Sequence, residues 1–158
     1  MKRFLSIIPI LLLTLLFTGC QVKEYTPELP ASFKQKASVS LGDFTFECEI
    51  CKNEATVDVT VLSTQAKGMV MSYNGEELTF TYEGFSHSIN GKGCEPSNTA
   101  IIVYEVFESL NTNAQSKKID GGYQHFGKIT LGDYILVQND DNSLKSIEIR
   151  SAGVIITF

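Results

Sequence analysis

Apolar and polar residues alternate with a period of two along most of the chain beyond residue 43. A period of two places successive side chains on opposite faces of a strand, which is typical of a half-buried β-sheet. We therefore predict strands at residues 44–50, 55–61, 69–73, 78–82, 85–89, 123–129, 134–138, 144–150 and 154–158.

Short polar links separate these stretches. Asn74-Gly75 lies between two of them, and both residue types tolerate the positive φ of a tight hairpin turn. Gly132-Asp133, Asp140–Asn142 and Gly153 separate the later ones. Such links are too short for parallel crossovers, which need a dozen or so residues. The pattern predicts a mainly β fold, an antiparallel sheet of about ten short strands.

Residues 97–110 have a different pattern. Ala100, Val103, Tyr104, Phe107 and Leu110 share one face of a helix, and Ser97 after Pro96 is a suitable N-cap. The β-branched residues of the same segment favour a strand, but its length favours a helix. A helix with so many apolar residues has to be enclosed on most sides. We predict one packed apolar helix here and a polar loop at residues 111–122.

The N-terminus has the pattern of a secretory signal. Lys2 and Arg3 precede an apolar run from Phe4 to Phe17, which is shorter than the roughly 20 residues of a membrane-spanning helix. An uncleaved N-terminal helix is the alternative. Residues 17–20, Phe-Thr-Gly-Cys, follow at once, with small residues directly before Cys20.

This end of the signal resembles the lipobox of bacterial lipoproteins, with Phe17 where that family usually has Leu. The resemblance implies cleavage before Cys20 and a diacylglyceryl group on its thiol. Two or three acyl chains hold a protein on a bilayer almost permanently. We expect a signal peptide at 1–19, a lipidated Cys20 and tether at 20–32, one β-rich domain at 33–158, and an extracytoplasmic location on the cell membrane.

Composition agrees with a folded domain and excludes one class of partner. Hydrophobic residues make up 43% of the 158 residues and charged residues 20%, which is a globular mixture. The formal net charge of -5 argues against a basic nucleic-acid surface. We expect the membrane to be a partner through the lipid anchor, and the sequence identifies no protein partner.

The remaining cysteines do not form a metal or redox motif. Cys48 and Cys51 are spaced as C-x-x-C, but on a strand they point to opposite faces, and Cys94 adds no second pair at zinc spacing. A structural disulfide or buried free thiols are the simpler readings. If any pair forms, we favour Cys48–Cys94, because Cys48 shares a face with Phe44 and Phe46.

No catalytic arrangement stands out. His87 lies between two serines on a predicted strand, without the G-x-S-x-G turn of a nucleophilic serine, and His125 is interpreted as a surface or half-buried sheet residue. No glycine-rich phosphate loop is present. We expect no enzyme activity, metal or cofactor. A hydrolase would require a buried polar cluster around His87 or His125.

The feature that suggests a function is a set of aromatic and methionine side chains. A curved sheet with such residues on one face, closed by an apolar helix, encloses an apolar groove, and methionine adapts to irregular ligands. These residues fill the core if no groove exists. The candidate lining residues are Met69, Met71, Phe80, Tyr82, Phe85, Tyr104 and Phe107.

The order of these features resembles that of a known group. The lipobox, the tether, the stretches Gly68–Gly75 and Leu78–Phe85, the apolar helix and the C-terminal strands resemble membrane-anchored lipoproteins with the fold of bacterial lipoprotein carriers. That fold is a curved half-barrel closed by helices, of which only one is predicted here. The resemblance implies non-catalytic binding of a lipid or an acylated protein. An envelope lipoprotein with a structural or interaction role is the alternative.

Overall fold

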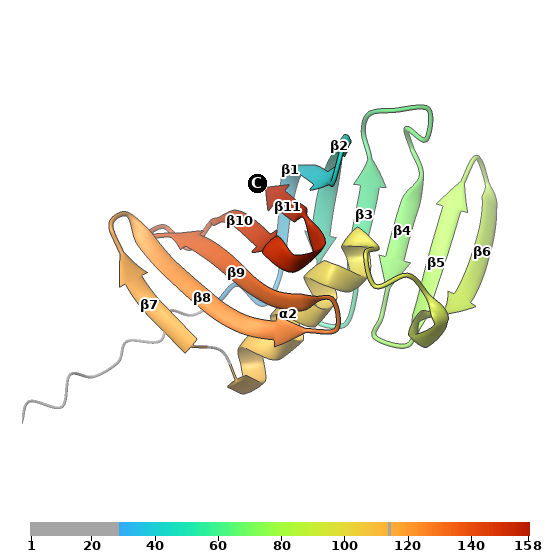
Figure 1. Cartoon of the computed structure of the whole chain (residues 1–158). Helices are drawn as coiled ribbons and strands as arrows, with labels where there is room; N and C mark the ends of the chain where they lie inside the picture. The colour runs from blue at the N-terminus through green and yellow to red at the C-terminus, as the bar shows by residue number, and fades with distance from the viewer. Residues whose placement is uncertain (1–28, 114) are drawn as a thin grey trace, which may run out of the picture.

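Eleven antiparallel strands form one continuous curved sheet in the part of the chain that the computed structural model describes, residues 29–113 and 115–158 (Figure 1). Their spatial order is β6-β5-β4-β3-β2-β1-β11-β10-β9-β8-β7. The strands are β1 Phe33–Leu41, β2 Phe44–Lys52, β3 Val57–Val61, β4 Val70–Tyr73, β5 Glu77–Tyr82, β6 Phe85–Asn90, β7 Gln115–Ile119, β8 Gly122–Ile129, β9 Gly132–Asn139, β10 Leu144–Ile149 and β11 Val154–Thr157.

The alternation of apolar residues explains the sheet. Residues on one face of β2, β3, β9 and β10 are buried, whereas most of their neighbours on the other face are exposed or half-buried. The predicted mainly β, antiparallel, curved fold with one helix is confirmed. Most strands pair with their sequence neighbours, but β1 pairs with β11 and so joins the N-terminal six strands to the C-terminal five.

Two strands were not predicted. β1 carries Gln35 and Ala37 among its inner positions, which weakens the apolar pattern of the strand. β7 falls within residues 111–122, where we predicted a polar loop; that prediction is wrong for residues 115–119, and for residues 111–113, which belong to the helix. β7 is an edge strand with mostly exposed residues, so it has no apolar face to reveal it.

The predicted helix is confirmed as α2, Thr99–Asn113, with a corrected start. Asn98, rather than Ser97, caps it: the backbone N–H of Ala100 donates to Asn98 Oδ1 at 2.9 Å. Ala100, Ile102, Val103 and Val106 have no exposed surface, as an almost wholly apolar helix requires.

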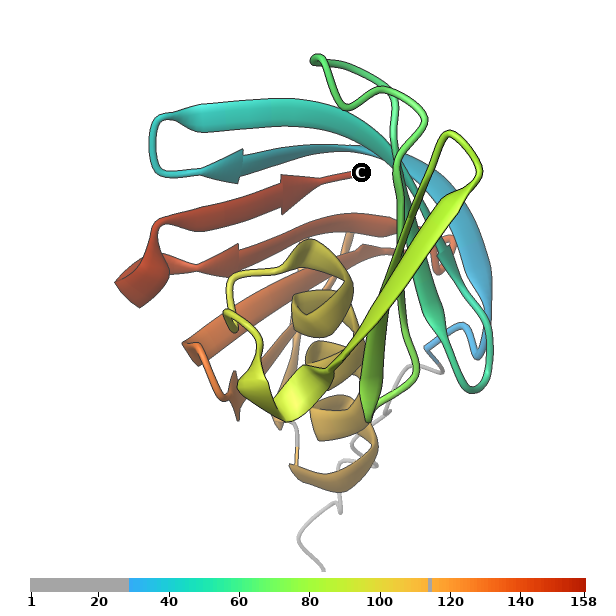
Figure 2. The same cartoon turned by 90° about the vertical axis from the view of Figure 1, so that its right-hand side faces the viewer.

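α2 lies inside the curl of the sheet, where it contacts β3 and β4 on one side and β8 on the other (Figure 2). Polar contacts fix it to the C-terminal strands. Glu105 accepts hydrogen bonds from the backbone N–H of Thr130 at 3.0 Å and from its hydroxyl at 2.8 Å. Tyr134 donates from its hydroxyl to the backbone carbonyl of Val106 at 3.5 Å. The helix therefore closes the concave face of the sheet.

Cys48, Cys51 and Cys94, the cysteines in the described part of the chain, are free thiols, so the favoured Cys48–Cys94 disulfide is not formed. Cys48 lies in β2, and Cys94 follows β6, with β3, β4 and β5 in between. Strands lie about 4.8 Å apart, whereas the Cα atoms of a disulfide lie within about 7 Å. Cys48 is fully buried and Cys51 is half-exposed, which confirms that they face opposite sides of the strand.

Candidate functional site

A hollow with an almost wholly apolar wall lies where β1–β2, the β3–β4 loop and the start of α2 meet. Its volume is about 170 Å³. It is lined by Leu41, Phe44, Phe46, Val61, Thr64, Ala66, Met69, Met71, Ser97, Asn98 and Thr99. We call this site the apolar hollow.

The β3–β4 loop forms one wall of the apolar hollow. Its backbone folds back on itself: the N–H groups of Gly68 and Met69 donate to the carbonyls of Val61 and Ala66, each at 2.9 Å. Gly68 adopts a φ of 91°, a conformation that glycine reaches without steric cost. This turn holds Ala66 and Met69 in the wall.

Both ends of the Asn98 amide in the opposite wall are hydrogen-bonded within the protein. Asn98 accepts a hydrogen bond at Oδ1 from the start of α2, and its Nδ2 donates to Met71 Sδ at 3.3 Å. At the mouth of the hollow Phe44 is 55% exposed, and its ring lies 5.7 Å from that of Phe46. The wall thus presents aromatic, aliphatic and sulfur surface to a ligand.

The structure brings only part of the predicted groove together. Met69 and Met71 line the apolar hollow. Tyr104 instead packs edge-on against Tyr73 at 5.1 Å, and Phe107 packs against Phe33 at 5.4 Å.

The other three predicted residues lie on the β5–β6 hairpin. Phe80 is half-buried, the hydroxyl of Tyr82 donates to the carbonyl of Gln65 at 3.4 Å, and Phe85 is 82% exposed. The seven residues therefore do not form one groove. Five lining residues that the sequence analysis missed are apolar residues near strand ends and in the β3–β4 loop: Leu41, Phe44, Phe46, Val61 and Ala66.

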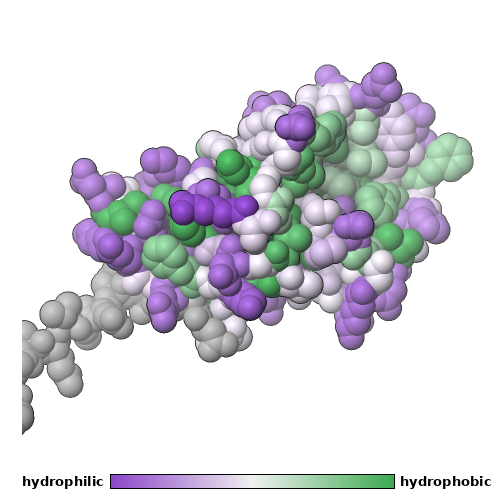
Figure 3. Space-filling view, in the orientation of Figure 1, coloured by the Kyte–Doolittle hydropathy of each residue, from purple (hydrophilic) through white to green (hydrophobic). Residues whose placement is uncertain are grey.

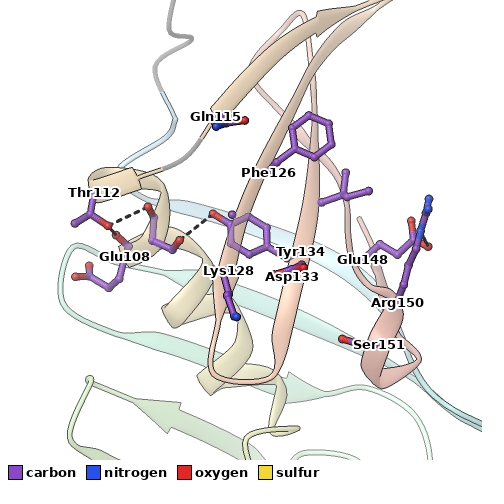
Figure 4. A pocket seen from close by; sticks show the side chains of 13 residues that line it. Glu108, Thr112, Gln115, Phe126, Lys128, Asp133, Tyr134, Glu148, Arg150 and Ser151 are labelled. Atoms are coloured by element: carbon purple, nitrogen blue, oxygen red, sulfur yellow. Dashed lines mark hydrogen bonds and ion pairs between the residues drawn. The ribbon is translucent and has the colours of Figure 1, made fainter.

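A second, larger hollow of about 1100 Å³ lies beside β8, β9 and the end of α2 (Figure 4). Its wall mixes apolar side chains with charged ones, among them Glu108, Lys128, Asp133 and the ion-paired Glu148 and Arg150. We favour the smaller hollow as a ligand site, because binding pockets have mainly apolar walls with few polar groups.

A buried polar cluster surrounds His125, which corrects its interpretation as a surface or half-buried residue. His125 is 1% exposed and Gln138 is fully buried. Nδ1 of His125 lies 2.8 Å from the hydroxyl of Ser116, and Nε2 lies 3.1 Å from Gln138 Oε1. The Gln138 amide nitrogen donates to the carbonyl of Asn142 at 3.3 Å.

This arrangement assigns the tautomer of His125. Gln138 presents an oxygen, which only accepts, so Nε2 carries the proton and Nδ1 accepts from Ser116. Burial lowers the pKa of His125, which keeps the ring neutral. The cluster joins edge strand β7 to β8 and β9. A histidine that accepts from a serine also occurs in nucleophilic pairs. Here the chain of hydrogen bonds from Ser116 through His125 to Gln138 is sufficient to explain a contact between strands.

The other chemical candidates are inert or isolated. Burial and nearby Glu47 raise the pKa of the Cys48 thiol to about 12, so it stays protonated and unreactive. His87 is exposed on β6. Among residues 29–113 and 115–158, no group of three or more His, Cys, Asp or Glu side chains could hold a metal ion. No helix in the same part of the chain is long and apolar enough to cross a membrane.

Cys20 lies outside the described residues, as do the signal peptide and most of the tether. The prediction of lipidation at this residue therefore stays a prediction. The first described residues, 29–32, lead into β1 at Phe33.

Comparisons with known proteins give a structural neighbour and no family. No protein-family model matches the chain, and no curated protein matches it. A solved LolA superfamily protein from Nitrosomonas europaea is a structural neighbour, with a TM-score of 0.38 and 11% sequence identity. The match covers 82% of this chain and 68% of that one. The function proposed below rests on the residues of this chain.

Proposed function

We propose that this protein is a non-catalytic, lipid-anchored lipoprotein outside the cytoplasm that binds an acyl chain of a lipid or of an acylated protein. The observation that carries the binding function is the apolar hollow, with Met69, Met71 and Phe46 in its wall and Phe44 at its mouth. Apolar walls favour apolar ligands because binding removes both surfaces from water.

The volume of the apolar hollow limits what enters it. An engineered apolar cavity of about 150 Å³ accepts one benzene molecule, and this hollow measures about 170 Å³. It therefore holds the end of one acyl chain rather than a whole lipid. The rest of the ligand would lie along exposed Phe44.

The orientation of β1 supports an outward-facing site. The tether enters at Phe33, whereas Leu41, at the other end of this nine-residue strand, lines the apolar hollow. At about 3.3 Å per residue the two ends lie about 26 Å apart. With the lipid on Cys20, the mouth would point away from the membrane that holds the protein, toward an incoming ligand.

Filling the apolar hollow tests the binding function. We expect Ala66→Phe to occupy the space and to weaken binding of the fluorescent fatty acid 11-(dansylamino)undecanoic acid at least tenfold, measured by fluorescence titration. Ala55→Phe is the matched control, because Ala55 is exposed and lies outside the lining. Equal binding by the wild-type protein and the Ala66 variant, with an unchanged thermal midpoint, would contradict the proposal.

Replacing the thiol tests the anchor. We expect Cys20→Ser, in the full chain with its own N-terminus, to release the protein from the membrane fraction and to remove the acyl mass at residue 20. Each buried CH₂ contributes about 0.8 kcal/mol, so the loss of two or three chains should abolish retention. Retention of the variant at the wild-type level would show that another segment holds the protein on the bilayer.

A structural or protein-interaction lipoprotein without a small ligand is the second candidate. The exposure of Phe85, Ile89 and Tyr82 on the β5–β6 hairpin favours it, since they expose 82%, 37% and 37% of their surface. Figure 3 shows apolar side chains reaching the surface at this end of the sheet. If the folded wild-type domain does not bind the fatty acid, the result favours this second candidate.

A further inference from the structure

The sheet ends in two edge strands of different chemistry. β7 carries Lys117 and Lys118, and lysines on an edge strand oppose pairing with another chain. β6, with the sequence Phe-Ser-His-Ser-Ile-Asn, has no lysine, carboxylate or proline, and all six of its residues are exposed. β6 is thus the edge without protection against an added strand.

The free backbone groups of β6 belong to two residues. Glu83 and Gly84 form a two-residue turn with positive φ at both positions, and Tyr82 pairs with Phe85 across it. Such a turn is closed by a hydrogen-bonded pair, and hydrogen-bonded and non-bonded pairs alternate from there. Ser86 and Ser88 therefore direct their N–H and C=O groups to the open side.

Asn90 would be the next residue to face outward, but it is already engaged. Its carbonyl accepts from the Cys94 thiol at 3.3 Å, and its side-chain oxygen caps the η1 turn (Gly91–Gly93) through the N–H of Lys92 at 2.9 Å. Ser86 and Ser88, one on each side of His87, are therefore the residues that offer both a donor and an acceptor to the open edge. This arrangement is symmetric about that residue.

We propose that β6 pairs antiparallel with β6 of a second copy of this chain, about a two-fold axis at His87. In this register Ser86 exchanges hydrogen bonds with the partner's Ser88, and Ser88 with the partner's Ser86. All four free groups on each side of the axis find partners, and the sheet continues from one protomer into the next.

Side chains on both faces match in the same register. On the concave face Phe85 lies opposite the partner's Ile89, so two exposed apolar side chains cover each other. On the other face the serines extend a row of hydroxyl contacts that already joins Thr79 to Ser88 at 2.8 Å and Thr81 to Ser86 at 3.3 Å. A second copy therefore provides apolar contacts on one face of the strand and hydroxyl contacts on the other.

Charge favours the antiparallel arrangement. Glu83 directly precedes β6 and Lys92 follows it closely, and both are exposed. Antiparallel pairing brings Glu83 of one copy to the end of the strand where the partner's Lys92 lies. The strand between them carries no formal charge that would repel its copy. A second copy of the chain is thus complementary in hydrogen bonding, apolar contact and charge.

Charge substitutions at the two-fold axis test the pairing. His87→Lys and His87→Glu each place like charges opposite one another in a homodimer and opposite charges together in a mixture. We expect the full chain in detergent micelles to sediment as a dimer. Each variant alone should dimerise at least tenfold more weakly, and an equimolar mixture of the two should recover dimerisation.

Gln115→Lys and Gln115→Glu are the matched controls, since Gln115 is exposed on the opposite edge strand. They should leave dimerisation unchanged. At a concentration low enough for all of these proteins to be monomeric, the thermal midpoints of the His87 variants should equal that of the wild type, because the side chain is exposed and the contribution of dimerisation to stability is then absent. A monomeric wild type overturns the proposal. So do variants that dimerise like the wild type, and a mixture that does not recover.

The result is independent of the ligand site. The apolar hollow is lined from β1, β2, β3, β4 and the segment before α2, and no β6 residue lines it. Fatty-acid binding by the His87 variants should therefore equal that of the wild type. Failure of the dimer and failure of the proposed binding function are thus separate outcomes.

Discussion

At the scale of single residues, the cluster of His125, Gln138 and Ser116 shows how one buried polar group determines the next. Gln138 is oriented by Asn142, and its oxygen then sets the tautomer of His125. The neutral ring accepts from Ser116 and holds β7 to the sheet. Because each group depends on its neighbour, a proton added to His125 removes the acceptor of Ser116 and places a charge in the core.

The pH dependence of stability should reveal this cluster. Burial lowers the pKa of His125 in the folded state, so the unfolded chain binds the proton more readily. Stability is then complete above the ordinary histidine pKa of about 6.5 and falls as the pH drops below it, by up to roughly 1.4 kcal/mol per pH unit. We expect urea unfolding to show a lower free energy of unfolding at pH 5.0 than at pH 7.5.

His125→Gln is the matched variant, because glutamine keeps a hydrogen-bonding side chain without a titrating ring. Its free energy of unfolding should change less over the same range. Asp141, whose pKa is lowered by hydrogen bonds from Ser143, loses its contribution only as the pH falls through lower values. A wild type and a variant with the same pH dependence between 7.5 and 5.0 would show that His125 does not titrate on unfolding.

The apolar hollow, our candidate ligand site, was only partly predictable at this scale. Met69 and Met71 were identified because methionines on one face of a strand are unusual enough to be noticed. Phe44 and Phe46 were assigned to one face of a strand. Nothing in the alternation shows that the residues of this face at the end of the strand line a hollow instead of packing in the core. Ala66 lies in a loop, and only the folded turn places it in the wall.

At the scale of elements, the alternation of apolar and polar residues predicted the strands that have one buried face. It missed an edge strand whose residues are mostly exposed. Strands with one buried face, such as β3 and β9, carry the alternation that burial demands. β7 has no buried face of that kind and is held by main-chain pairing with β8 and by one serine. The length and apolar content of α2 outweighed its β-branched residues, because an enclosed helix tolerates them.

The start of α2 depends on one side chain. Asn98→Ala removes the hydrogen bond to the N–H of Ala100 and the contact with Met71 Sδ, and we expect a loss of about 1 kcal/mol in the free energy of unfolding. Ser97→Ala, one residue earlier, should change it by less than about 0.5 kcal/mol. Urea titrations of both variants measure the difference. An equal loss of unfolding free energy in the two variants would contradict the assignment of Asn98 as the N-cap.

At the scale of the whole molecule, one strand pair joins two hairpin arrays. β1–β6 and β7–β11 are each built from sequence-adjacent pairs, and β1 with β11 is the pair between them. α2 also bridges the halves by contacting β3, β4 and β8. Alternation predicts the strands other than β1 and β7, but it contains no signal for which distant strands meet. This closure could therefore not be predicted from the sequence pattern.

Because the halves share this junction and the helix, we expect them to unfold together. Ile156 of β11 is fully buried and lies between Val39 of β1 and Ile147 of β10. Ile156→Ala should lower the free energy of unfolding by about 2–5 kcal/mol. Ile155→Ala, on the opposite face and 46% exposed, should cost well under half as much.

The same experiment shows whether the sheet is one cooperative unit. Tyr73 and Tyr104 report on the N-terminal half and on α2, and Tyr123 and Tyr134 on the C-terminal half, so tyrosine fluorescence and far-UV circular dichroism sample both. A weakened junction in a cooperative sheet moves both urea transitions together, since neither half keeps its core without the other. If the two probes separate in Ile156→Ala, each half has enough packing of its own, and β1–β11 pairing joins two independently stable units.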